Sequence, residues 1–139
     1  MRAALLAALL ALPLLASPAL ALDEADGQAI RGVIERQIEA FRRDDTAAAY
    51  AQAAPGIQRL FPSEEVFMRM VREGYAPVYR PQEFSFGAAG ESPAGPTQSV
   101  RVRDAAGVDW TALYTLERQP DGTWRISGCT LTREPGENV

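Results

Sequence analysis

The sequence predicts an α+β domain in which three helices precede a four-stranded antiparallel sheet. From residue 23 to residue 43, apolar side chains recur at helical spacing, with charged residues on the opposite side. From residue 108 to residue 133, two segments of alternating side chains flank Pro120-Asp121-Gly122, a sequence typical of a hairpin loop. We expect the helix to cover the apolar face of this hairpin.

The loop sequence also predicts the pairing of the two hairpin strands, because side chains that face each other across a strand pair share a face. Tyr114 is expected opposite Gly128, and Leu113 opposite Cys129. The face expected to be covered carries Ala112, Tyr114, Leu116, Trp124 and Ile126, with Trp110 further along. The other face is mostly polar, with an apolar island of Leu113, Cys129 and Leu131.

Three further helical segments are indicated after residue 43. Asp44 or Asp45 is expected to cap an alanine-rich helix over 46–53, and 57–61 adds one turn. Ser63 is expected to cap a helix over 64–73 that ends at Gly74. Two prolines, Pro77 and Pro81, predict no helix beyond that point.

The segments from residue 82 to residue 107 are predicted to be short strands separated by a loop and followed by a turn. Strands are expected over 82–87 and 98–103, and a Gly/Pro-rich loop over 90–96 separates them. A turn over 104–107 leads into the hairpin, and 134–139 is expected to fray.

The first 21 residues have the pattern of a secretory signal. Arg2 precedes an apolar run, and Ala19-Leu20-Ala21 matches a cleavage site. Cleavage leaves residues 22–139, a suitable length for a single domain. We therefore expect a periplasmic or secreted protein with no stable membrane anchor after cleavage.

Composition narrows the classes of function. The net charge of −4, without a basic run, argues against nucleic-acid binding. The chain has no histidine, no lysine and a single cysteine, Cys129, so zinc sites, the usual catalytic triads, Schiff-base chemistry and an intrachain disulfide are excluded for this chain alone. We expect no metal and no cofactor.

Several segments resemble an uncharacterised bacterial family, domain of unknown function 4864. The resemblance rests on the run from Ile38 through Asp44-Asp45, Phe61, the segment 75–81 and the ending 120–129. The layout is also similar to the nuclear-transport-factor-2-like, or SnoaL-like, cone fold. That resemblance implies N-terminal helices packed on the concave face of a curved four-stranded sheet, with a cavity between them. A strand often found before the third helix of that fold is not evident.

Candidate ligand-pocket residues are the polar groups that could line such a cavity: Tyr50, Tyr79, Arg80, Asp109, Tyr114 and Arg118. Tyr114 is the sharpest hint, because Gly128 opposite it would leave room beside the ring, although aromatic packing over a glycine explains the same pattern. Arg80 could bind an anion or pair with Glu73 or Glu83.

Three functions remain open at this stage. The cavity could hold a small apolar or anionic ligand without transforming it. The island of Leu113, Cys129 and Leu131 could form a homodimer or partner surface on the outer sheet face. Alternatively, Asp109 or another desolvated carboxylate could act as a general base with tyrosine hydroxyls, as in cone-fold isomerases, dehydratases or hydrolases. We expect a non-catalytic binding or interaction domain ahead of an enzyme.

Overall fold

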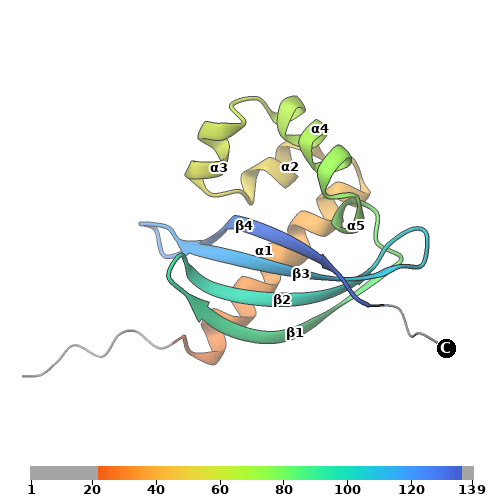
Figure 1. The fold of residues 1–139 in the computed structure, drawn as a ribbon. Helices are drawn as coiled ribbons and strands as arrows, with labels where there is room; N and C mark the ends of the chain where they lie inside the picture. The colour runs from red at the N-terminus through yellow and green to blue at the C-terminus, as the bar shows by residue number, and fades with distance from the viewer. Residues whose placement is uncertain (1–21, 136–139) are drawn as a thin grey trace, which may run out of the picture.

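The computed structural model describes residues 22–135, so the expected signal segment and the last four residues of the expected tail lie outside the described residues. Within these described residues, five helices precede a sheet of four antiparallel strands in the order β1-β2-β3-β4. Helix α1 passes across the sheet, and α2, α3 and α4 gather at its β4 side, away from β1 (Figure 1). The predicted α+β architecture is confirmed.

Helix α1 (Glu24–Arg42) begins at a capping box, in which Asp23 and Asp26 each accept a hydrogen bond from the other's backbone N–H. Its apolar stripe is buried, with Ile34 and Ile38 at 0% exposure. Within the described part of the chain, no helix is both long and apolar enough to span a membrane.

The helices that follow are short. They are α2 (Thr46–Ala51), α3 (Pro55–Leu60), α4 (Glu64–Gly74) and α5 (Ala76–Tyr79). Asp45 caps α2 and Ser63 caps α4, as predicted. The prediction that Pro77 prevents a helix after Gly74 is wrong. Pro77 lies in the first turn of α5, where its missing N–H would have no helical partner.

The sheet consists of β1 (Glu83–Ser92), β2 (Gly95–Arg103), β3 (Asp109–Arg118) and β4 (Trp124–Arg133). The predicted loop over 90–96 is wrong, because pairing between β1 and β2 continues to Ser92 and Gly95. The Ser92 hydroxyl donates to the Gly95 carbonyl at 2.9 Å and closes this tight hairpin. The turn over 104–107 forms as expected, with the Asp104 carboxylate accepting from two backbone N–H groups.

The β3–β4 hairpin follows the predicted register only near its loop. Gly122 has φ +86°, the left-handed conformation that the loop requires. Leu116 pairs with Ile126 as predicted, but Thr115 pairs with Gly128, so Ser127 is an extra residue in β4. Such a β-bulge shifts every later pair by one. The predicted pairing beyond Leu116 is therefore wrong.

The bulge changes which side chains share a face. Cys129 lies opposite Tyr114, and Leu131 lies opposite Ala112, on the face that the helices cover. Both pack against the hydrophobic core. Leu113 stays on the outer face at 42% exposure. The predicted outer island of Leu113, Cys129 and Leu131 is thus wrong. On the predicted covered face, Trp110 is half-buried and the other five residues are buried: Ala112, Tyr114, Leu116, Trp124 and Ile126.

Candidate functional site

A cavity of about 400 Å³ lies between the short helices and the inner side of β4. It opens beside Leu60, a side chain 75% exposed. Its walls are mainly apolar side chains from α1, α3, α4 and the segment after α3: Phe41, Ile57, Phe61, Phe67, Met70 and Val71. Concave, mostly apolar sites with a few polar groups are typical of small-molecule binding.

An aromatic cluster forms much of one wall. The Phe67 ring lies 6.4 Å from Phe41, 5.4 Å from Tyr50 and 6.5 Å from Phe61, measured between centroids. The Tyr50 hydroxyl donates to the Phe61 carbonyl at 2.7 Å and thereby fixes the end of α3. These ring contacts link α1, α2, α4 and the end of α3 beside the cavity.

Tyr114 and Cys129 place a hydroxyl and a thiol side by side in the lining of the cavity. The two residues face each other across β3 and β4, and both line the cavity. Tyr114 is 1% exposed, and its hydroxyl makes no hydrogen bond of standard geometry within residues 22–135. Burial raises the pKa of the Tyr114 hydroxyl well above its usual value, and it raises the pKa of the Cys129 thiol to about 12. The neighbouring Cys129 thiol is the polar group that interacts with the Tyr114 hydroxyl, and it adds to the rise of the Tyr114 pKa. Both groups therefore keep their protons near neutral pH.

The bulge in β4 is what places Cys129 in the cavity. On the free edge of β4, the Ile126 carbonyl accepts from the Ala54 N–H, and the Ile126 N–H donates to the Gln52 carbonyl, each at 2.8 Å. These bonds form an isolated bridge between Ala53 and Ile126. They anchor β4 to the chain before α3, at the residue that precedes the bulge.

Gln37 adds a polar group from α1. Its side chain is 5% exposed, and its amide nitrogen donates to the Ala49 carbonyl at 3.2 Å. Sequence reasoning missed this residue, although a glutamine within the apolar stripe of a predicted helix is a recognisable signal. Cys129 was missed as a cavity residue because no local signal reveals the bulge.

Of the six candidate pocket residues, only Tyr114 lines this cavity. The other five candidates lie outside the lining of this cavity. Tyr50 is held behind the wall by its bond to Phe61.

Tyr79 and Arg80 instead bind the connection between α1 and α2. The Tyr79 hydroxyl and the Arg80 guanidinium both donate to the Asp44 carboxylate, with the arginine bond at 2.7 Å. Arg80 also donates to the Phe41 carbonyl at the end of α1. Asp44 has φ +52°, a conformation that aspartate tolerates. Its carboxyl pKa lies below the usual 3.8, chiefly because of the Tyr79 hydrogen bond.

Asp109 and Arg118 lie at opposite ends of β3, and both are paired on the surface. The Asp109 carboxylate accepts from Arg103 at 3.0 Å. Arg118 bonds to Asp26 of α1 and stacks over the Trp124 ring, 4.7 Å from its centroid. No aspartate or glutamate of residues 22–135 is among the side chains that line the cavity. The carboxylate proposed as a general base is therefore remote from it.

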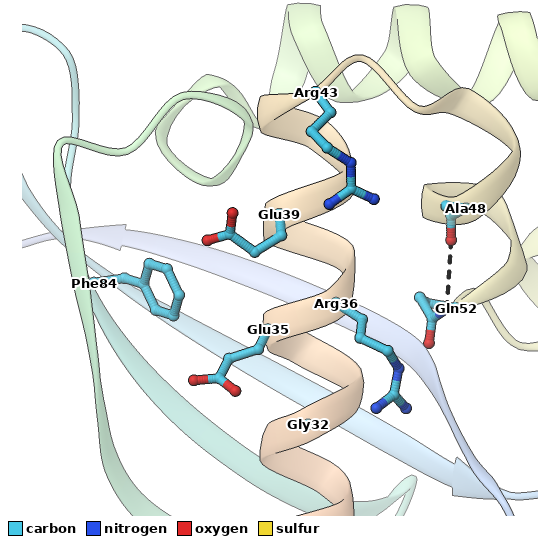
Figure 2. A pocket seen from close by; sticks show the side chains of 8 residues that line it. All are labelled: Gly32, Glu35, Arg36, Glu39, Arg43, Ala48, Gln52 and Phe84. Carbon is cyan, nitrogen blue, oxygen red and sulfur yellow. Dashed lines mark hydrogen bonds between the residues drawn. The ribbon is translucent and has the colours of Figure 1, made fainter.

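A second pocket of about 500 Å³ lies along the exposed side of α1. Figure 2 shows Glu35 and Glu39 pointing toward Phe84, while Arg36 and Arg43 point to the other side of the helix. Neighbouring residues already pair two of these charges, since Arg42 bonds Glu39 at 2.8 Å and Arg43 lies 3.6 Å from Asp45. This pocket therefore differs from the cavity beside β4 in its charged lining, which carries both acidic and basic side chains.

The helices packed on one face of an open, curved antiparallel sheet have the fold of an NTF2-like protein. The structure is similar to a crystal structure of an NTF2-like protein of unknown function from Shewanella baltica OS155. The two share 14% sequence identity and a TM-score of 0.56, over 84% of this chain and 99% of that one. No curated protein matches the sequence. Residues 23–139 match the family described as domain of unknown function (DUF4864), and the chain belongs to that family.

Proposed function

We propose that this domain is exported and binds a small, neutral, mostly apolar molecule in the cavity beside β4, without transforming it. The observation that carries the proposal is the cavity itself: its walls are mainly aromatic and aliphatic, and its lining includes Tyr114, whose buried hydroxyl makes no standard hydrogen bond within residues 22–135. Burial of an apolar ligand there would contribute about 25 cal/mol per Å² of apolar surface removed from water.

The charge distribution favours a neutral ligand over an anionic one. No arginine among residues 22–135 lines the cavity. Arg80 and Arg118, the cations once expected there, are bonded to Asp44 and Asp26. An anion taken into an apolar cavity without a cation loses its hydration and gains no counter-charge. The anionic alternative is therefore the weaker one.

Plugging the cavity tests the proposal. Nile red, a neutral dye that fluoresces in apolar surroundings, should bind the wild-type protein. Met70→Trp introduces bulk on α4 at the cavity wall, and Val66→Trp introduces the same side chain on the same helix at a position 42% exposed. We expect Met70→Trp to abolish dye binding and Val66→Trp to preserve it. Equal binding by both variants, with both folded by circular dichroism, would refute the proposal.

Export depends on the first 21 residues, whose pattern supports a periplasmic or secreted location. Cell fractionation followed by mass spectrometry tests this part. The expected product is a periplasmic or secreted chain that begins at Leu22. An uncleaved cytoplasmic chain would refute export and leave ligand binding unaffected.

The two alternative functions, an enzyme and a homodimer formed through the outer sheet face, receive less support. An isomerase, dehydratase or hydrolase of the expected type needs a carboxylate in the cavity, and the expected Asp109 is paired at the surface. A homodimer through the outer sheet face would have to form without Cys129 and Leu131, which lie on the inner face. Light scattering at high protein concentration tests the dimer directly.

A further inference from the structure

We propose that the ligand presents a carbonyl oxygen to the Tyr114 hydroxyl, with the Cys129 thiol as a second donor beside it. This inference rests on the proposed function, and it names the class of ligand: a neutral ketone, aldehyde or ester with an apolar body.

The Tyr114 hydroxyl supplies the first step of the argument. A buried polar group without a hydrogen-bond partner destabilises the folded state, and such groups are few in folded proteins. Tyr114 is 1% exposed, and its hydroxyl is the single buried side-chain polar atom of residues 22–135 without a partner. Because Tyr114 lines the cavity, a ligand atom can supply the missing acceptor.

Cys129 determines the kind of acceptor. It lies directly opposite Tyr114 and lines the same cavity, so the hydroxyl and the thiol are adjacent donors. A carbonyl oxygen has two lone pairs and can accept from both. An alcohol would bring a proton of its own to two groups that already carry protons. A carbonyl oxygen therefore complements this end of the cavity better.

Desolvation supports the same conclusion. Burial raises the pKa of both groups, which shows that negative charge is disfavoured at this place. A carboxylate ligand would carry such a charge, whereas a neutral carbonyl accepts hydrogen bonds without one. The aromatic and aliphatic walls then surround the rest of the ligand.

Butyrophenone and butylbenzene test this inference, because they have nearly the same shape and differ by a carbonyl group. Each compound is used to displace Nile red from wild-type protein and from Tyr114→Phe, so that two compounds and two proteins give four affinities. We expect Tyr114→Phe to weaken the binding of butyrophenone about tenfold and to leave the affinity for butylbenzene unchanged. The carbonyl stretch of bound butyrophenone should lie at lower wavenumber in the wild type than in Tyr114→Phe. Tyr79→Phe, whose hydroxyl bonds Asp44 outside the cavity, is the matched control and should change neither affinity.

The outcomes separate the inference from the proposed function. If both compounds bind and Tyr114→Phe changes neither the ratio of their affinities nor the carbonyl stretch, the inference is overturned while ligand binding stands. If Nile red binds but neither compound displaces it, the inference fails as well. If Nile red itself does not bind the folded wild-type protein, the proposed function fails first.

Discussion

Tyr114 and Cys129 face each other across β3 and β4. The Tyr114 side chain is buried, and Cys129 is half-buried. The hydroxyl and the thiol are both held in their protonated forms by burial. This pair connects the architecture of the sheet to the cavity, because the bulge that precedes Cys129 decides which side of the sheet the thiol occupies.

Replacing Tyr114 by phenylalanine should stabilise the protein in the absence of ligand. The substitution removes a buried hydroxyl without a partner, so the free energy of unfolding should rise by about 1 kcal/mol. Urea denaturation measures the change. Tyr50→Phe provides the contrast, since it removes a hydroxyl bonded to Phe61 and should lower the free energy of unfolding by about 1 kcal/mol. Equal losses in both variants would mean that the Tyr114 hydroxyl has a partner.

Cys129 should resist alkylation in the folded protein. Burial raises its pKa from 9.0 to about 12, so its thiolate fraction near neutral pH is roughly a thousandfold lower than that of a free thiol. Iodoacetamide labelling, followed by mass spectrometry, should be correspondingly slow and should accelerate in urea. Rapid labelling of the folded chain would contradict the burial of this thiol.

The same thiol predicts a decline of stability in alkali. The unfolded chain releases the thiol proton near pH 9.0, whereas the folded chain retains it to about pH 12. Between these values the folded state binds more protons, so its stability falls as the pH rises. Urea denaturation across this pH window should show a steeper decline for the wild type than for Cys129→Ala. Parallel declines would exclude a contribution from Cys129.

Gly128→Ala should destabilise the hairpin, because a Cβ atom at this position would lie 2.6 Å from the Thr115 hydroxyl oxygen. We expect a loss of about 1–2 kcal/mol in the free energy of unfolding, mostly recovered in the double variant with Thr115→Ala. Gly87→Ala on β1 is the control, since its Cβ would meet Ser99 at an ordinary 3.5 Å. Similar losses at both glycines would argue against the Thr115–Gly128 pairing.

Asp44→Asn should lower the thermal midpoint near neutral pH and have less effect in acid. Asparagine tolerates the positive φ of this residue but lacks the charge that Arg80 pairs with. The folded pKa of Asp44 lies below 3.8, so the contribution of its carboxylate is present above that value and is lost as the pH falls through the folded pKa. Thermal unfolding at both pH values measures the difference. A gap between wild type and variant that persists in strong acid would rule out the ionic origin.

The sequence by itself determined the features that depend on neighbouring residues. The spacing of Ile30, Ile34 and Phe41 gave α1 and its buried stripe. Gly122 gave the hairpin loop, and alternation from that loop identified the buried face that carries Trp124 and Ile126. Helical periodicity and turn chemistry operate over a few residues, so a sequence displays them directly.

Only the tertiary structure decided which groups meet in the cavity. The bulge at Ser127 directly follows Ile126, which bonds to Gln52 and Ala54, more than 70 residues away along the chain. It moves Cys129 from the predicted outer face to Tyr114. The bond between Arg118 and Asp26 of α1 also joins residues that are far apart in the sequence, and no local pattern predicts it. Alternation along a strand gives side-chain direction only while the pairing is unbroken, and distant contacts determine where it breaks.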